Sequence, residues 1–290
     1  MKQCFIPKRF NRSTQIVIHQ ANEIIEEYQQ ESLRLTLRQL YYQFVARDML
    51  PNTQKDYHRL SRIISDARLA GLIDWDAIVD RTRYLRGINY STDPGQTIKD
   101  CVYNFHLDHW EGQKYQLEVW IEKEALLGVI SQICYQMDVD YFACKGYPSQ
   151  TSVYDAAQRS LNHNRKTVII HLGDHDPSGM DMTRDIEERM FLLSGRPVSI
   201  ERIALNFDQV EEYSPPPNPA KMTDTRAREY ISDYGHECWE LDALTPTVVR
   251  DLIEDKVKQY RNDKVYKKVL KQEKEYKKTL QHLADNWEKV

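Results

Sequence analysis

The sequence predicts an α/β protein in which a helical N-terminal domain precedes a domain built on a mostly parallel sheet. Two observations predict this class. In the N-terminal part of the chain, apolar residues recur at helical spacing in consecutive segments. From residue 115 onward, short apolar runs alternate with helical segments. Such alternation is typical of a parallel sheet with helices on both faces.

The bulk properties of the chain limit its class. Its 290 residues are enough for two domains, each with its own core. The formal net charge of -4 gives no overall basic excess, so a nucleic-acid contact has to be local. The 5 cysteines contain no C-x-x-C pair, which argues against a disulfide framework and a zinc knuckle. We see no signal-peptide core and no apolar run of about 18 residues, so we expect a cytoplasmic protein without membrane contact.

The first 90 residues predict two helical units. Residues 1–33 predict an irregular start and one helix, without evident chemistry. Residues 34–90 contain two helices joined by a short turn, and LIDWDAIVDRTRYLRG follows as a further turn and wing, so we predict a winged-helix DNA-binding domain. From residue 34 to residue 86, ten lysines or arginines against six aspartates make the region locally basic. The side chains that we expect to contact DNA lie on the second helix and are His58, Arg59, Arg62 and Arg68.

The first helix of this domain carries a pair of tyrosines in the sequence LRQLYYQFVARD. Thr36 and Gln39 have the spacing of a capping box at its start. Helical spacing places Tyr41 in the apolar stripe, whereas Arg38 and Tyr42, four residues apart, share a neighbouring face. We therefore expect Tyr42 to be the more exposed tyrosine.

The rest of the chain divides into three segments. Residues 91–113 contain turn formers and no long periodic run, so we predict a connector. Residues 114–255 predict the sheet domain, with strands in YQLEVWI, DYFACKGY, KTVIIHL and VSIERIAL. Residues 256–290 predict one long basic helix that packs its apolar stripe on its own domain, although Glu273 interrupts the stripe. A coiled coil and a contact with nucleic acid are the alternatives.

Carboxylates gather at two of the predicted strand ends. Asp174 and Asp176 follow KTVIIHL, and residues two apart on an extended segment point the same way. A third carboxylate is expected at the end of YQLEVWI, where Glu122 and Glu124 are both candidates. Carboxylates this close repel, which favours a site for Mg²⁺, or Mn²⁺, completed by water and a substrate phosphate. Such a cluster is typical of metal-assisted phosphoryl transfer.

Other roles are open for several of these residues. The Asp-x-Asp pattern also occurs in turns and helix caps, which is the alternative for Asp174 and Asp176. His171 and His175 flank the pair, but their spacing matches no usual zinc ligand set, so we expect both to be structural. We expect Lys123 to be a solvated surface lysine.

Several stretches of the sequence carry a family resemblance. VWIEKEA, KGYP, GDHDPSG, RIAL and WELDAL occur in the order seen in the Toprim domain of the topoisomerase VI A subunit. The same domain occurs in the meiotic relative of that subunit, the transesterase that makes double-strand breaks. RQLYY resembles the winged-helix motif of these proteins, in which an arginine stands four residues before the catalytic tyrosine. The resemblance covers roughly residues 34 to 250.

The resemblance implies a winged-helix domain, a Toprim domain and a Mg²⁺-dependent enzyme that breaks DNA by tyrosine transesterification. Glu122 matches the strand-end glutamate of the family, and Asp174 and Asp176 match its metal-binding aspartates. Arg38 matches its arginine and Tyr42 its nucleophile. Relatives of this type work as homodimers, in which the tyrosine of one subunit meets the metal of the other. A separate ATPase subunit is a further partner to test.

Two other functions stay open at this point. Metal-activated water in place of Tyr42 would make the protein a hydrolytic endonuclease, as found in some prokaryotic defence systems with related folds. A DNA-binding accessory subunit with a vestigial site is the third hypothesis. Ser149 stands where the relatives usually show aspartate after Gly-Tyr-Pro, which argues against full topoisomerase activity.

Overall fold

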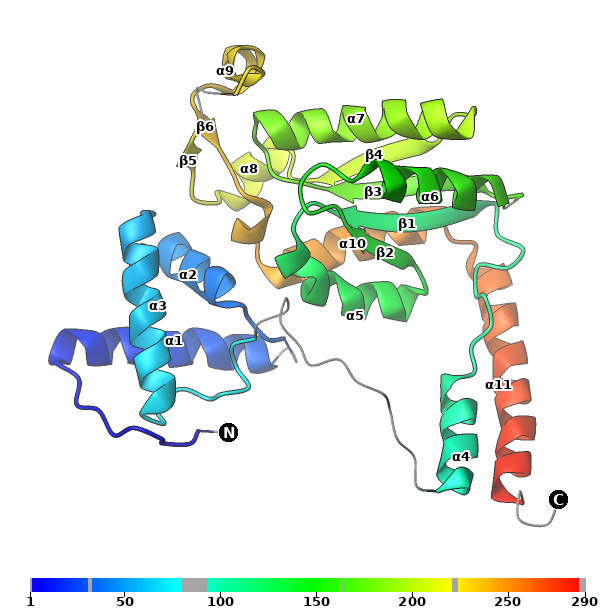
Figure 1. Cartoon of the computed structure of the whole chain (residues 1–290), viewed down its shortest axis with the longest axis horizontal. Coiled ribbons are helices and arrows are strands. Elements are labelled where there is room, and N and C mark those ends of the chain that lie inside the picture. The colour runs from blue at the N-terminus through cyan, green and yellow to red at the C-terminus, as the bar shows by residue number, and fades with distance from the viewer. Residues whose placement is uncertain (1, 31–32, 80–92, 163, 221–223, 287–290) are drawn as a thin grey trace.

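The structure is a computed structural model that describes residues 2–30, 33–79, 93–162, 164–220 and 224–286. Figure 1 shows helices α1 to α3 on one side of the molecule and a helix-covered sheet on the other. Helices α4 and α11 extend from the sheet as a pair. The fold is therefore mixed α/β, as predicted.

The N-terminal part consists of α1 (Arg12–Gln30), α2 (Leu37–Ala46) and α3 (Gln54–Leu69). The predicted capping box starts α2: Thr36 Oγ1 accepts the N–H of Gln39 at 3.2 Å, and Gln39 Oε1 accepts the N–H of Thr36 at 2.9 Å. The three helices share one apolar core. Its fully buried members include Ile24, Leu40, Phe44, Leu60 and Ile64.

After α3 the chain turns and returns to the start of α2. Leu35 and Ile78 form an isolated parallel bridge, and the N–H of Val79 donates to the carbonyl of Leu35 at 3.0 Å. The wing that we expect next falls mainly on residues 80–92, which lie outside the described residues. The winged-helix domain therefore stays a prediction.

The central sheet has four parallel strands in the order β2-β1-β3-β4. They are β1 (Tyr115–Ile121), β2 (Asp140–Ala143), β3 (Lys166–Leu172) and β4 (Ser199–Ala204). The parallel sheet confirms the alternating pattern seen in the sequence, and β1 and β3 begin and end where their apolar runs do.

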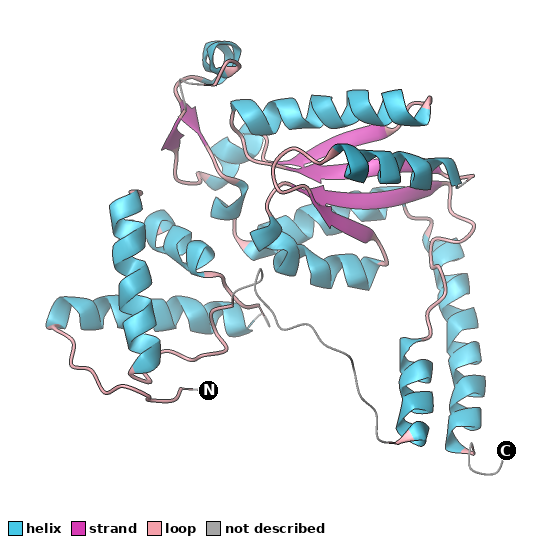
Figure 2. Ribbon diagram, in the orientation of Figure 1, coloured by secondary structure: helices cyan, strands magenta, loops and turns pink. Residues whose placement is uncertain are grey.

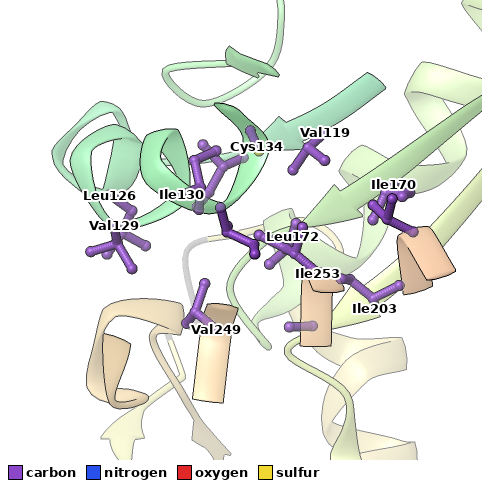
Figure 3. Packing of buried hydrophobic residues seen from close by; sticks show 14 of the residues in the cluster. Val119, Leu126, Val129, Ile130, Cys134, Ile170, Leu172, Ile203, Val249 and Ile253 are labelled. Atoms are coloured by element: carbon purple, nitrogen blue, oxygen red, sulfur yellow. The ribbon is translucent and has the colours of Figure 1, made fainter. Parts of the chain in front are cut away.

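Helices cover both faces of this sheet (Figure 2). α5 (Leu127–Met137) and α10 (Pro246–Tyr260) pack on one face, and α6 (Gln150–Asn162) and α7 (Pro177–Ser194) pack on the other. Successive strand residues point to opposite faces, so both faces are apolar. Figure 3 shows the first of the two cores, which includes Val119, Ile130, Ile170, Leu172, Ile203, Val249 and Ile253.

Short elements complete the edge where the strands end. A 3-10 turn, η1 (Glu124–Leu126), leads from β1 into α5. After β4 come α8 (Phe207–Tyr213) and α9 (Ala227–Tyr234). The next turn, η2 (Leu241–Ala243), packs against α2. A two-stranded antiparallel sheet flanks them, formed by β5 (Asn218–Pro219) and β6 (Glu237–Cys238).

The segment predicted as a connector contains a helix, α4 (Pro94–Asn104). The sequence D-P-G predicts a turn, but Asp93 accepts the N–H of Gly95 at 2.9 Å and so caps a helix. Pro94 occupies the first turn, where no intrahelical N–H is needed. The helix lies beside α11 (Asp263–Asp285), so the partner that stabilises it comes from the far end of the chain.

The basic tail is not one helix, and the prediction over residues 256–290 was wrong in this respect. α10 continues to Tyr260, and α11 starts after Asn262. The side chain of Asn262 accepts the N–H groups of Lys264 and Val265 and caps α11. A capping residue inside the basic run therefore divides it. No helix in the described ranges has the length and apolar character needed to cross a membrane.

Candidate functional site

The ends of β1 and β3 lie side by side, because Ile121 and Leu172 are register partners. The N–H of Glu122 donates to the carbonyl of Leu172 at 2.9 Å, which extends the pairing by one residue. Glu122 Oε2 then accepts the backbone N–H of Asp174 at 2.8 Å. The structure thus brings together two of the three carboxylates that the sequence predicts at this edge.

The guanidinium of Arg202 on β4 is largely buried and supports the turn that follows β3. Its nitrogens donate to the carbonyls of Gly173, Asp174, Gly179 and Leu205 at distances between 2.7 and 3.0 Å. Burial lowers the pKa of Arg202 to about 10, while the nearby carboxylates oppose this fall. Arg202 therefore fixes the backbone that carries the acidic residues.

Asp176 caps the helix that follows the acidic turn. Its Oδ1 accepts the N–H of Gly179 at 2.6 Å and the hydroxyl of Ser178 at 2.9 Å. The turn is tight, because a Cβ at Gly179 would lie 2.2 Å from the carbonyl oxygen of Asp174. Helix capping, the alternative role that the sequence left open, is thus what Asp176 performs in this structure.

Both carboxylate oxygens of Asp174 have partners within the chain. Oδ1 accepts the N–H of Leu241 at 2.8 Å, and Oδ2 lies 3.0 Å from Lys123 Nζ. Burial raises the pKa of Asp174 to about 7; Glu122 and Asp242 add to the rise, and Lys123 opposes it. The ion pair with Lys123 therefore favours the charged form of Asp174, whereas burial disfavours it.

Lys123 connects Asp174 to two further acids that sequence reasoning missed. Its Nζ lies 2.9 Å from Glu240 Oε2 and 3.1 Å from Asp242 Oδ1. Burial disfavours the charged lysine, but Asp242, Asp174 and Glu240 outweigh burial and raise the pKa of Lys123. The expectation of a solvated surface lysine was wrong, because three carboxylates from distant segments surround it.

Arg38 and Tyr42 join the same network from α2. Arg38 Nη2 forms an ion pair with Glu240, and Arg38 Nε lies 3.1 Å from Asp242 Oδ2. Arg38 Nη2 also donates to the hydroxyl of Tyr42 at 3.3 Å. Burial opposes ionisation of Glu240, but Lys123 and Arg38 outweigh it and lower the pKa of Glu240 to about 2. The predicted arginine and tyrosine are therefore connected to the strand ends through Glu240 and Asp242.

Tyr42 is not the exposed tyrosine that helical spacing predicts. Its relative exposure is 3%, against 4% for Tyr41. The prediction was wrong because η2 covers the second face of α2. Burial raises the pKa of the Tyr42 hydroxyl, and Asp242 and Glu240 add to this effect against the opposition of Arg38.

The two acids that complete the network lie in WELDAL, a stretch that belongs to the family resemblance. Asp242 is buried, and Glu240 is partly buried. The sequence shows an acidic residue on each side of Leu241, but it does not show which residues these two acids contact. The N–H of Trp239 donates to the carbonyl of His175 at 2.9 Å, which ties this stretch to the acidic turn.

The histidines beside the aspartates have structural environments, as expected. His171 is buried in β3, and its Nδ1 lies 2.9 Å from Thr183 Oγ1. Burial, assisted by Arg202, lowers the pKa of His171 to about 3. His175 Nδ1 lies 2.7 Å from the hydroxyl of Tyr230, and burial lowers the pKa of His175 to about 4. The rings around His175 are those of Phe207, Tyr230, Tyr234 and Trp239.

The predicted DNA-binding residues on α3 fall into two groups. His58, Arg59 and Arg62 are exposed. Arg68 instead donates from Nη2 to the carbonyl of Trp75 at 2.7 Å, and its guanidinium lies 4.5 Å from the centre of that indole ring. Three of the four residues are therefore available to a ligand, whereas Arg68 stabilises the turn after α3.

The predicted metal ligands are of the chemical type that Mg²⁺ prefers, but their positions are not those of ligands around one ion. Carboxylate oxygens suit this hard cation. Across the described ranges, however, Glu122, Asp174 and Asp176 do not converge on a common point as a ligand group does. Asp174 would have to leave Lys123, whereas Asp176 caps α7 through Oδ1 and would use Oδ2 for an ion.

Neither a protein-family model nor a curated protein matches the chain. The function is therefore inferred from the residues and their geometry. The geometry unites a tyrosine, an arginine, a lysine and several carboxylates at the carboxyl edge of a parallel sheet, which is where such sheets bind ligands.

Proposed function

We propose that the chain is a Mg²⁺-dependent enzyme that cleaves phosphodiester bonds in DNA. One observation supports it most. An unbroken series of polar contacts runs from Tyr42 through Arg38, Glu240 and Lys123 to Asp174. A hydroxyl, two cations and strand-end acids are the groups that phosphoryl transfer requires. The Toprim resemblance and the winged-helix resemblance support the same reaction.

In the preferred mechanism, the phenolic oxygen of Tyr42 attacks the phosphorus. A phosphotyrosine bond forms and the bond from phosphorus to a deoxyribose oxygen breaks. The phenol loses its proton to water, and the leaving deoxyribose oxygen takes one proton from water, so the step balances. Arg38 stabilises the charge that develops on the non-bridging oxygens. Arg38 contacts Glu240 through Nη2 and Asp242 through Nε, and its side chain is 48% exposed, so a phosphate would approach a guanidinium that these carboxylates already hold in place.

The metal site in this proposal uses the residues at the strand ends. Glu122 and Asp174 would hold the ion with Asp176, and Mg²⁺ or Mn²⁺ would neutralise charge on the phosphate when bound. Lys123 provides positive charge at Asp174 in the absence of an ion. The side chain of Asp174 therefore has to exchange a lysine for the metal.

A hydrolytic endonuclease is the second candidate, and the burial of Tyr42 favours it. The hydroxyl lies among carboxylates that, together with burial, disfavour the phenolate. Water would then attack the phosphorus, and Tyr42 would act only as a hydrogen-bond partner of Arg38. The two mechanisms differ in one product, the covalent protein–DNA bond.

Tyr42→Phe should abolish strand breakage by the preferred mechanism, because it removes the attacking oxygen and keeps the ring. The parent protein, stopped with detergent during cleavage in Mg²⁺, should carry DNA ends that are covalently attached. Gel electrophoresis before and after protease digestion measures both results.

Tyr41→Phe is the matched control. The hydroxyl of Tyr41 accepts the N–H of Thr53 at 2.8 Å and donates to the carbonyl of Thr53 at 2.9 Å, so this variant loses at least two structural hydrogen bonds of about 1 kcal/mol each. It keeps the hydroxyl of Tyr42 and should retain most of its activity. Cleavage by Tyr42→Phe together with free DNA ends from the parent would instead establish the hydrolase. DNA binding without cleavage under all conditions would leave the accessory-subunit hypothesis.

Replacing Arg59 and Arg62 by Ala should weaken duplex binding and flatten its dependence on salt. Both side chains are exposed on α3, and each arginine that no longer binds a phosphate reduces the slope of log K against log salt concentration by about 0.9. Fluorescence anisotropy across a salt series measures the slope. Arg12→Ala, an exposed arginine at the start of α1, is the control. An unchanged slope would move the binding surface to the lysine-rich α11.

The partners in this proposal are duplex DNA, a second copy of the chain and a separate ATPase subunit. The homodimer and the ATPase follow from the resemblance alone. The contacts between Arg38, Glu240 and Lys123 lie within one chain, so the network forms without a second copy. Light scattering of the purified protein, with and without DNA, tests for the dimer.

A further inference from the structure

We propose that the chain holds a Zn²⁺ ion at a second centre, at the opposite end of β1 from the acidic residues. Its ligands are His106, His109 and Glu273, whose donor atoms lie within 4.8 Å of one another. The two histidines stand in the loop between α4 and β1, and the glutamate is in α11. This site is independent of the proposed DNA cleavage.

Glu273 is a buried acid with polar partners at both of its carboxylate oxygens. It interrupts the apolar stripe of the tail, and it is only 6% exposed. Its Oε1 lies 2.9 Å from Lys277 Nζ, and its Oε2 accepts the backbone N–H of Leu107 at 2.9 Å. Oε2 also faces two imidazole nitrogens, His109 Nε2 at 2.6 Å and His106 Nδ1 at 3.3 Å. Two ring nitrogens therefore converge on one buried carboxylate.

The remaining nitrogen of each ring faces a second carboxylate, that of Asp138. Asp138 Oδ1 lies 2.8 Å from His106 Nε2, and Asp138 Oδ2 lies 3.3 Å from His109 Nδ1. Asp138 Oδ2 also accepts the backbone N–H of His109 at 2.9 Å. A carboxylate that accepts the second N–H of a metal-bound imidazole is the usual support for histidine ligands.

The arrangement of the two rings leaves a place for a cation. Two of the four contacts between ring nitrogens and carboxylates have hydrogen-bond geometry, that of His106 Nε2 with Asp138 and that of His109 Nε2 with Glu273. When the N–H of each ring is on the nitrogen that faces Asp138, the other nitrogen of each ring presents a lone pair to Glu273. A divalent ion there would take both lone pairs and the carboxylate as ligands.

The donor set favours zinc over magnesium. Two imidazole nitrogens and one carboxylate oxygen are typical Zn²⁺ ligands, whereas Mg²⁺ prefers oxygen. At tetrahedral zinc, ligand atoms about 2.1 Å from the ion stand about 3.4 Å apart, so the contact between His109 and Glu273 has to open. The side chain of His106 is 43% exposed, which leaves water access to the fourth position. The bound ion would fasten α11 to the loop before β1.

The test is a Zn²⁺ titration of the full-length chain after removal of metals with a chelator. Competition with a fluorescent chelator should show one bound Zn²⁺ per chain. Asp138→Asn should weaken binding by about 10- to 100-fold, as expected for loss of a supporting carboxylate. His106→Ala and Glu273→Gln remove ligands and should weaken binding further. Circular dichroism without metal should show that these variants are folded.

Two controls separate this site from other histidines and from the acidic residues. His282→Ala removes an exposed histidine from the same helix and should leave Zn²⁺ binding unchanged. Combining Glu122→Gln with Asp174→Asn should also leave it unchanged, whatever happens to DNA cleavage. The proposal is overturned if the parent chain binds no stoichiometric Zn²⁺, or if His106→Ala and Glu273→Gln bind it as tightly as the parent.

Discussion

Replacing Glu122 by Gln, or Asp174 by Asn, should reduce DNA cleavage by roughly a thousandfold, because each change removes a carboxylate that the proposed metal site needs. Both amides keep the shape of the side chain. The amide oxygen of the Glu122→Gln variant can still accept the N–H of Asp174, and that of the Asp174→Asn variant can still accept the N–H of Leu241. Initial cleavage rates in saturating Mg²⁺ measure the effect.

Glu124→Gln is the matched control for these variants. The sequence made Glu122 and Glu124 equal candidates, but the carboxylate of Glu124 lies 2.9 Å from Lys145 Nζ instead of at the acidic turn. This variant should cleave at nearly the parental rate. If Glu122→Gln also cleaves at that rate, the strand-end carboxylates do not form the reactive site in either mechanism.

Arg202→Met should lower the free energy of unfolding by about 3–5 kcal/mol, because it leaves several buried backbone carbonyls without a donor. These include the carbonyls of Gly173 and Asp174, so the loss falls on the turn that carries the acidic pair. Urea denaturation followed by circular dichroism measures the change. We expect cleavage to fall as well, since the turn loses its support.

Arg184→Met serves as the control for this substitution. Arg184 lies on the exposed face of α7 and pairs with Asp181 and Glu188 at 2.6 Å, and such surface pairs contribute less than about 1 kcal/mol each. If Arg202→Met lowers the free energy of unfolding by no more than Arg184→Met does, then water replaces the guanidinium of Arg202. The supporting role inferred for Arg202 would then be wrong.

The sheet and part of the site could be predicted from the sequence, because they depend on local patterns. A strand that is buried on both faces is a continuous apolar run, which is why β1 and β3 have the predicted limits. Polar residues directly after such runs lie at the same edge of a parallel sheet. The contact between Glu122 and Asp174 follows from that rule.

The other features depend on contacts between segments that are far apart in the chain. Periodicity identifies the apolar face of α2, but it does not reveal that η2 covers the face that carries Tyr42. The sequence predicts a solvated Lys123, because its partners Glu240 and Asp242 lie more than a hundred residues away along the chain. The same holds for α4, which packs against α11 from the far end of the chain.

The lysine shared by Asp174, Glu240 and Asp242 has a thermodynamic consequence. In the proposed reaction, a phosphate that drew Arg38 away from Glu240 would leave this carboxylate dependent on Lys123, and a cation bound at Asp174 would release Lys123 toward Glu240. The two events then favour each other. Linkage is reciprocal. If the cation raises the affinity of Arg38 for phosphate by some factor, the phosphate raises the affinity of Asp174 for the cation by the same factor. The protein would therefore respond to the two ligands together more steeply than to either one alone.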